Sequence, residues 1–478
     1  MTLPGVEINP STAFIRRISA KVTVPFVLLA SLVFIAASAI ISKGGMLQFE
    51  MDARMPAHLS GQPLSTLLFS GALDISRPRQ LSFIFDIVDA YFIALCVRIG
   101  IPHFLSFTHY LFTTLIGIIS WFFFVQKLKM NRQAALLLIL IFYFSPAMLF
   151  ATYFRTAKIG AGLMIAIVIC AVCQGGAKVR RKWWVHLLGT CTLAICACSA
   201  MFFDEQGVSI IGAVLIALIV LAIKERTCDR LFQCLAVGTA ILFYGLFCIY
   251  LYPHLVLKAT GSLPDFDWQS SIPWNYAIRP ENIEQGMLLF ADTIRFLYGN
   301  ITVYQVIVVV GGALVFALFL RRTSFLQRQG LKKAVGLLPL TFVVATIAFC
   351  VAMNTVMYVR HTPLGWPDLR RVYYWIPTVV GVILLAPWLF RKVLMFKAED
   401  GRKPIVVLML LVFLLGGNLL AIPEHKAIIW GGHLNAEYSA APLMLDSLRN
   451  IHNPGHEVPP EIASNGIYKL LAAFAHAR

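Results

Sequence analysis

The sequence predicts an all-α, polytopic transmembrane protein with about eleven membrane-spanning helices. Apolar stretches of about 20 residues recur along the whole chain, and each is long enough to cross a bilayer as a helix. Of the 478 residues, 59% are hydrophobic and only 13% are charged, whereas soluble domains are typically about 25% charged. The abundance of Phe, Leu, Ile and Val also excludes a disordered chain. The length is therefore used for membrane spans rather than for several soluble domains.

The spans follow one another with short connections in most places. They are expected at residues 22–42, 106–125, 134–152, 159–174, 185–202, 208–223, 231–251, 301–320, 334–357, 372–390 and 404–422. Together they form a transmembrane domain over residues 1–422, which leaves 423–478 as a small C-terminal tail.

The net charge of +17 reports on orientation. Lys and Arg concentrate in six short segments, at 16–21, 126–133, 178–182, 224–230, 321–333 and 391–403. Because cytoplasmic loops are rich in Lys and Arg, this alternation predicts a cytoplasmic N-terminus and a tail on the opposite, periplasmic side. No nucleic-acid-binding motif accompanies the basic residues, so nucleic acid is not an expected partner.

A twelfth apolar segment, 81–97, would break this alternation if it crossed the membrane. Its polar residues Ser82, Asp86 and Asp89 are spaced four and three apart, so they share one helical face. The other positions are mainly aromatic and aliphatic. This pattern predicts an amphipathic helix that lies in the membrane interface without crossing.

The outer side then holds three large pieces, which are the first loop at 43–105, the loop at 252–300 and the tail at 423–478. None of the ten cysteines falls in the hydrophilic parts of these pieces, so no disulfide framework is expected there. Cys170 and Cys173 lie inside a span and are interpreted as packing residues. The tail histidines are assigned no metal, and the tail is expected to form a small outer cap.

The first loop contains a candidate base and a candidate phosphate site. Glu50 and Asp52 come just after the first span, where an apolar surrounding raises the pKa of a carboxylate and suits it to accept a proton. Asp74, Arg77 and Arg79 lead into the interfacial helix, and arginine suits phosphate because its fork bonds two oxygens. The alternatives are a solvated loop acid and ordinary headgroup anchoring. Asp86 of the interfacial helix is added to the expected substrate-binding set.

Two short outer turns contain further charges. Arg155 and Lys158 lie in the first, against the positive-inside bias, which favours an anionic partner. Asp204 and Glu205 lie in the second, where a short polar turn explains them equally well.

Later outer segments repeat the pattern. Arg279 lies in the loop at 252–300 among aromatic and acidic side chains, a combination typical of sugar binding and of membrane-interface belts alike. His361, Arg370, Arg371 and Tyr373 lie at the outer mouth of a span, where a phosphate ligand would account for the adjacent arginines.

This order of features resembles the GT-C glycosyltransferases. The shared features are an acid soon after the first span (Asp52), a basic Pro-containing turn (76–81), an interfacial helix that leads into the second span, and an arginine-bearing second outer turn (152–157). Arg371, Tyr373 and Pro377 are similar to the arginine–tyrosine pair and proline at a late span of many members. The acid that often follows the second-turn arginine is replaced here by Ile159, Gly160 and Ala161.

The resemblance implies an inverting glycosyltransferase that moves a sugar from a polyprenyl-phosphate carrier to a lipid-linked glycan or lipid acceptor. The implied setting is the periplasmic face of a bacterial inner membrane, in O-antigen or lipopolysaccharide modification. Asp52, with Glu50 in reserve, would accept the acceptor's proton. Arg155, Lys158, Arg370 and Arg371, supported by Arg77 and Arg79, would stabilise the phosphate leaving group. No cofactor is expected; a divalent metal is possible but not indicated.

Three alternatives stay open at the level of sequence. The first is an O-antigen polymerase or ligase, which also acts on lipid-linked sugars. A long outer loop late in the chain would favour this alternative. The second is a flippase or transporter of lipid-linked sugars. Polar residues throughout the spans, and broken helices at corresponding positions of the two halves of the chain, would favour it. A non-catalytic membrane assembly subunit would tolerate loss of every outer charge.

Overall fold

The fold is known from a computed structural model. It describes residues 24–41, 59, 61–69, 78–145, 148–149, 156–174, 183–204, 206–262, 279–281, 283–285, 287–288, 341, 344–345, 348, 380–381, 384, 387, 403–431 and 440–476. Within these ranges every regular element is a helix. Five of the described helices are long and apolar enough to cross a membrane. The coarse prediction of a helical chain with several possible spans is therefore confirmed.

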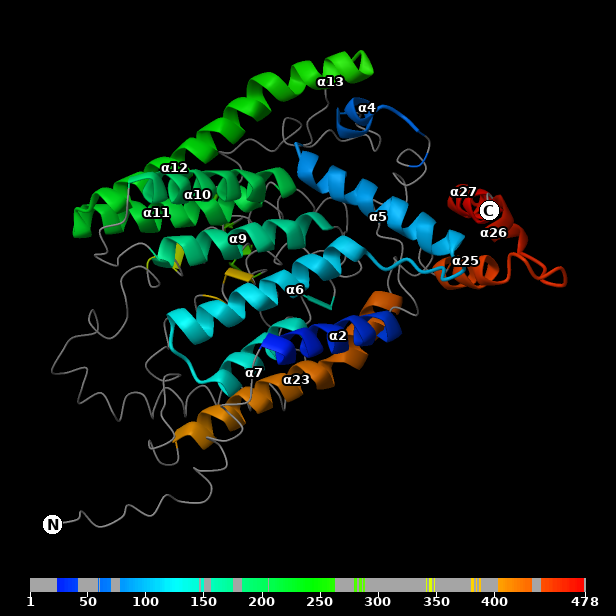
Figure 1. Cartoon of the computed structure of the whole chain (residues 1–478), viewed down its shortest axis with the longest axis horizontal. Helices are drawn as coiled ribbons and strands as arrows, with labels where there is room; N and C mark the ends of the chain where they lie inside the picture. The colour runs from blue at the N-terminus through cyan, green and yellow to red at the C-terminus, as the bar shows by residue number, and fades with distance from the viewer. Residues whose placement is uncertain are drawn as a thin grey trace, which may run out of the picture.

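The main bundle contains most of the helices (Figure 1). They are α2 (Val24–Ile41), α6 (Phe107–Phe122) with the π-helical turn η1 (Phe123–Lys127), α7 (Arg132–Tyr143), α9 (Thr156–Gln174), α10 (Trp183–Phe203), α11 (Gly207–Glu225), α12 (Cys228–Leu246) with η2 (Phe247–Leu251) and α13 (Tyr252–Thr260), and α23 (Lys403–Gly431). Eight of the eleven predicted spans overlap these helices. The predicted spans 301–320, 334–357 and 372–390 lie outside the described residues, apart from isolated positions.

The bundle has two groups of neighbouring helices (Figure 1). α10 packs against α9, α11 and α12, while α2, α7 and α23 form the other group and α6 lies between the groups. A hydrogen bond of 2.7 Å between Ser31 and Tyr143 joins α2 to α7. At one end of the bundle, Arg230 donates to the Val172 carbonyl and pairs with Glu225, both at 2.9 Å. Those basic loops that the sequence predicts to be cytoplasmic and that the structure describes lie at this end of the bundle.

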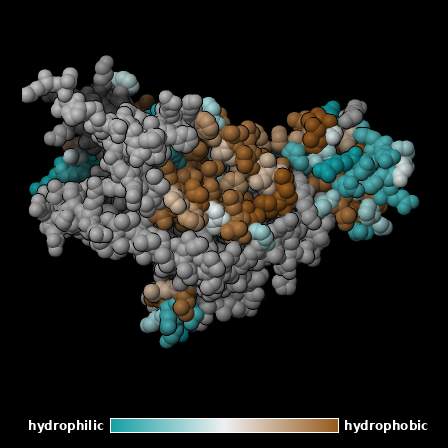
Figure 2. Space-filling model, turned by 90° about the horizontal axis from the view of Figure 1, so that it is seen from below, coloured by the Kyte–Doolittle hydropathy of each residue, from teal (hydrophilic) through white to brown (hydrophobic). Residues whose placement is uncertain are grey.

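The outer surface of the bundle suits contact with lipid. Large apolar side chains such as Leu32 of α2, Leu188 of α10 and Leu242 of α12 are each 62% exposed. Figure 2 shows a broad hydrophobic surface next to the more hydrophilic tail helices. Since water would make such a surface costly, a bilayer is the medium that this surface fits.

The predicted interfacial helix is α5 (Gln80–Arg98), and its polar face points inward. Ser82, Asp86 and Asp89 are at most 2% exposed, whereas Val88 and Leu95 on the opposite face are 42% and 53% exposed. The shared polar face is thus confirmed, but it contacts protein rather than water. α5 lies near the end of the bundle where α9 and α11 begin (Figure 1). Its length also allows a crossing, so the non-crossing assignment stays a prediction.

The tail forms three short helices that cover the far half of α5. These are α25 (Ala440–Arg449), α26 (Pro460–Ser464) and α27 (Gly466–His476). Leu445, Leu448 and Leu471 pack with Ile93 and Val97 of α5 in one buried cluster. The tail is therefore attached to the first loop, at the right of Figure 1.

Two predicted boundaries differ from the structure. α12 continues through η2 and α13 to Thr260, so the loop expected from residue 252 begins later. α13 contacts α4 (Leu64–Phe69), and the Tyr252 and Phe69 rings lie 6.2 Å apart there. α23 continues through Pro423 to Gly431, so the span expected to end at 422 is longer. Proline removes one backbone donor, and membrane helices tolerate this when neighbouring groups satisfy the freed carbonyl.

Candidate functional site

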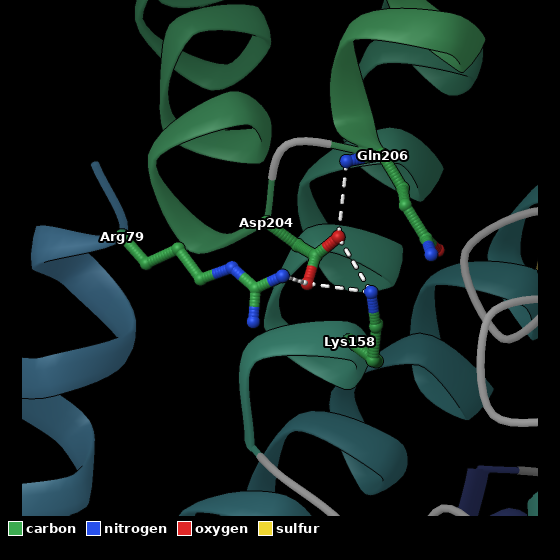
Figure 3. A network of polar contacts seen from close by, with 4 residues as sticks. All are labelled: Arg79, Lys158, Asp204 and Gln206. Carbon is green, nitrogen blue, oxygen red and sulfur yellow. Dashed lines mark hydrogen bonds and ion pairs between the residues drawn. The ribbon is translucent and has the colours of Figure 1, made fainter. Parts of the chain in front are cut away.

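A buried ion cluster, formed by Arg79, Lys158 and Asp204, joins three turns at one end of the bundle (Figure 3). Arg79 directly precedes α5, Lys158 lies in the first turn of α9, and Asp204 follows the last residue of α10. Lys158 Nζ lies 2.7 Å from both carboxylate oxygens of Asp204, and Arg79 Nη2 lies 3.4 Å from Oδ2. Each of these side chains is at most 1% exposed. Three predicted outer segments therefore meet at one carboxylate.

Helix ends add positive potential to the ion cluster. α5, α9 and α11 all begin beside it, and the backbone N–H of Gln206 donates to Asp204 Oδ1 at 3.0 Å. A helix N-terminus acts as roughly half a positive charge. The three side chains themselves contribute two positive charges and one negative charge. The combination favours an anion, and phosphate is an anion that Arg, Lys and helix N-termini commonly bind.

Close packing places Asp204 at this position. Phe203, the residue before it, stacks on Phe85 of α5 with ring centroids 5.4 Å apart. A Cβ on Gly160 of α9 would lie 2.4 Å from the Phe203 ring, and one on Gly207 would lie 2.6 Å from the Ala200 carbonyl oxygen. Only glycine at these two positions lets α9 and α11 approach the end of α10 so closely. The position of Asp204 therefore depends on residues without side chains.

The other acids of α5 differ in their surroundings. Asp89 Oδ1 accepts the Thr108 N–H at 2.9 Å, and Oδ2 accepts the Thr108 hydroxyl at 2.6 Å and the Ser106 hydroxyl. Asp89 thus binds the first turn of α6 and has a structural role. Asp86 lies one turn closer to the ion cluster and is 2% exposed.

Several polar side chains near this end are buried but unsatisfied. Among the described residues, no hydrogen-bond partner is found for either amide atom of Gln80, for Ser82 Oγ, for Gln206 Oε1 or for either ring nitrogen of His109. Gln80 is 9% exposed, Gln206 5%, and Ser82 and His109 are fully buried. In Figure 3 the Gln206 side chain extends alongside Lys158. Native proteins rarely leave such groups without a partner.

The sequence-based set of site residues omitted Gln80, Gln206 and His109. Signals for them existed, because Gln80 follows Arg79 directly, Gln206 shares the turn of Asp204, and His109 is an ionisable residue at the start of a predicted span. Their burial is what the sequence did not indicate.

Many predicted site residues are not part of the described structure. Glu50, Asp52, Asp74, Arg77, Arg155, Glu205, His361, Arg370, Arg371 and Tyr373 lie outside the described residues. Arg279 is described and exposed, in contrast to the buried ion cluster. Of the predicted set, the structure brings together Arg79, Lys158 and Asp204, with Asp86 two turns along α5.

The described residues offer few candidates for a metal site or a reactive cysteine. No group of three or more His, Cys, Asp or Glu side chains there is arranged to hold a metal ion. The nine cysteines of those ranges are free thiols, and Cys196 and Cys248 are buried in the main core.

No protein-family model matches the sequence, and no curated protein or solved structure is significantly similar to it. The GT-C resemblance therefore rests on the order and spacing of this chain's own residues. What the structure adds is the geometry of the ion cluster and of α5.

Proposed function

We propose that this chain is a membrane glycosyltransferase that moves a sugar from a polyprenyl-phosphate carrier to a lipid-linked glycan or lipid acceptor. The observation that supports the proposal best is the meeting of Arg79 and Lys158 at Asp204. Two cations from separate turns, together with three helix N-termini, form a buried positive end on an apolar bundle. A lipid phosphate is an anion that reaches such a place from the membrane.

The ion cluster would act on the leaving group. When the anomeric carbon is attacked, the bond to the carrier phosphate breaks and negative charge develops on that phosphate. Lys158 and Arg79 would stabilise this charge, while Asp204 holds both cations in place before the donor binds. Because phosphate is already a good leaving group, no general acid is required.

The base of the reaction is proposed from the sequence. Asp52, with Glu50 in reserve, would accept the proton of the acceptor hydroxyl or amine, and the acceptor would attack the face opposite the phosphate, with inversion. Loss of a general base typically lowers the rate about 100- to 10,000-fold. We place the reaction on the periplasmic face of a bacterial inner membrane, in O-antigen or lipopolysaccharide modification.

The test is transfer by purified protein in liposomes, with a polyprenyl-phosphate sugar as donor and a glycolipid acceptor. Lys158→Gln should lower transfer about 100- to 1,000-fold, as expected when one charge-stabilising group is lost. The matched control is Lys224→Gln, because Lys224 is exposed in the last turn of α11, at the other end of the bundle. Its transfer rate should not change.

A second variant separates folding from catalysis. The double substitution Lys158→Gln, Asp204→Asn removes one cation and one carboxylate, so the summed charge of the ion cluster is unchanged. We expect a folded protein with little transfer. Wild-type transfer by this double variant would show that the cluster only stabilises the fold, and full activity of Asp52→Asn would exclude Asp52 as the base.

A further inference from the structure

The side chain of Gln206 lies beside the ion cluster. Gln206 directly precedes the first turn of α11, and its side chain extends alongside Lys158 in Figure 3. It is 5% exposed, and its Oε1 is buried without a hydrogen-bond partner among the described residues. The site therefore contains a neutral, buried polar group next to one of its cations.

The backbone of the turn holds Gln206 in this place. The Gln206 N–H donates to Asp204 Oδ1 at 3.0 Å, and the Gly207 N–H donates to the Asp204 carbonyl at 2.8 Å. The Gln206 carbonyl accepts the Ser209 N–H at 3.1 Å. The main chain on both sides of Gln206 is thus fixed relative to the carboxylate that both cations contact.

The start of α11 does not itself require a glutamine. This position of a helix favours Ser, Thr, Asp or Asn, whose short side chains accept an N–H of the first turn. The Gln206 side chain makes no such bond. Gln133, near the start of α7, also has an Oε1 without a partner among the described residues. What distinguishes Gln206 is its place beside Lys158 at the N-terminus of a 19-residue helix.

An unsatisfied acceptor selects the chemistry of its partner. A buried acceptor without a donor is costly, and a bound hydrogen-bond donor removes that cost. The phosphate of a polyprenyl-phosphate sugar is a diester whose oxygens only accept. It can bond to the cations of the ion cluster, but it cannot satisfy Gln206 Oε1. A hydroxyl or an amide N–H of the ligand can.

The sugar of the donor has one such group close to the phosphate. Its anomeric carbon carries the phosphate oxygen and the ring oxygen, and both of these are acceptors. The next ring carbon, C2, carries a hydroxyl in most sugars and an acetamido N–H in N-acetylhexosamines, and both of these donate. With the phosphate at Lys158, the substituent of C2 is the hydrogen-bond donor nearest to the ion cluster.

We infer that Gln206 accepts a hydrogen bond from the C2 substituent of the donor sugar. This inference rests on the proposed function, because it places the carrier phosphate at the ion cluster. The bond makes the protein select 2-hydroxy or 2-acetamido sugars and reject 2-deoxy sugars. Gln206 is then a residue that determines which donor is bound.

Binding to the full chain in lipid nanodiscs tests the inference. The probes are bare polyprenyl phosphate and polyprenyl phosphate that carries glucose, galactose, xylose or N-acetylglucosamine, each compared with its 2-deoxy form. Wild-type protein should bind at least one of these sugars about three- to tenfold more tightly than its 2-deoxy form, the effect of one hydrogen bond. Gln206→Met removes the acceptor at similar side-chain volume. It should bind the two forms equally and the bare carrier like wild type.

Two comparison variants sharpen the result. Gln206→Glu keeps an acceptor at the same position but adds a negative charge beside the phosphate. It should weaken both forms of the sugar alike and keep the preference between them. Gln133→Met also removes a glutamine oxygen without a partner among the described residues, but beyond the far end of α6, and it should change no affinity.

The outcomes separate this inference from the proposed function. Wild-type protein that binds no carrier, bare or loaded, would overturn both. Wild-type protein that binds the bare carrier but distinguishes no sugar from its 2-deoxy form would overturn the role of Gln206 alone. A Gln206→Met variant that keeps the preference, or that loses bare and loaded carriers equally, would show that Gln206 is structural.

Discussion

Lys158 Nζ lies 2.7 Å from both carboxylate oxygens of Asp204, although 46 residues separate the two along the chain. Both side chains are fully buried, so neither can be hydrated if the other is lost. Removal of one partner of a buried pair usually costs far more than the pair contributes. Because of this asymmetry, single substitutions in the ion cluster should change the stability of the protein measurably.

Asp204→Asn should destabilise the protein by about 3–5 kcal/mol, because it leaves Lys158 and Arg79 buried beside a neutral amide. The midpoint of thermal unfolding in detergent measures this effect. Glu225→Gln is the matched control, since Glu225 also pairs with an arginine but is 38% exposed. Its cost should be at most about 1 kcal/mol. Equal shifts for both variants would contradict the special role of burial at Asp204.

Gly160→Ala should displace Phe203 and with it Asp204. The new Cβ would lie 2.4 Å from the Phe203 ring, and overpacking of this kind typically costs about 1–3 kcal/mol. Gly189→Ala in the exposed face of α10 meets no atom within 4 Å. It should be neutral or stabilise the helix by up to about 1 kcal/mol. The midpoints of thermal unfolding of the two variants, measured together, decide whether Gly160 is needed for the close approach of α9 to the end of α10.

Leu471→Ala should loosen the tail from α5. Leu471 is fully buried in the cluster with Ile93 and Val97, and truncation of a buried leucine costs about 2–5 kcal/mol. Hydrogen–deuterium exchange should quicken in α27 and in residues 90–97 together. Leu443→Ala, at a side chain 47% exposed, should change neither segment. Faster exchange in α27 alone would mean that the tail does not support α5.

His103 should make the link between α5 and α6 sensitive to acid. Burial lowers the pKa of His103 below its usual 6.5, and its Nδ1 accepts the Leu105 N–H at 3.1 Å, which requires a neutral ring. A lowered pKa in the folded protein means that stability is present above pH 6.5 and is lost as the pH falls. His103→Asn keeps an acceptor but does not titrate.

The midpoint of thermal unfolding, measured between pH 7.5 and 5 for wild type and His103→Asn, tests this expectation. The wild-type midpoint should fall more steeply as the pH is lowered. Parallel curves would show that His103 does not titrate in this range.

The sequence predicted the helices well where their apolar runs are long. It also placed Ser82, Asp86 and Asp89 on one face of α5, since a three- and four-residue spacing fixes this in any helix. It did not predict that the face points inward. In a membrane protein apolar residues face lipid, so an amphipathic pattern alone does not tell which face meets protein.

The candidate site was predicted as separate charges. Lys158 and Asp204 were each selected because they lie in outer turns, but their pairing depends on how closely α9, α10 and α11 pack. That packing depends on Gly160 and Gly207, which no charge pattern singles out. Gln80 and Gln206 join this site only in the structure, because an uncharged polar residue becomes informative only when its burial and its lack of partners among the described residues are known. His109 is ionisable, but its full burial at the start of α6 is likewise visible only in the structure.

The attachment of the tail to α5 has a consequence for biosynthesis. α9 and α10 are complete soon after residue 204 has been made, so Lys158 and Asp204 can pair early. Ile93 and Val97 of α5 share a buried cluster with Leu59 and Phe104, and the rest of that cluster is added only when residues 440–476 have been synthesised. The helix that begins at Gln80 is thus among the first made and among the last to be fully covered, so a chain that ends before residue 440 would lack the tail's support for α5.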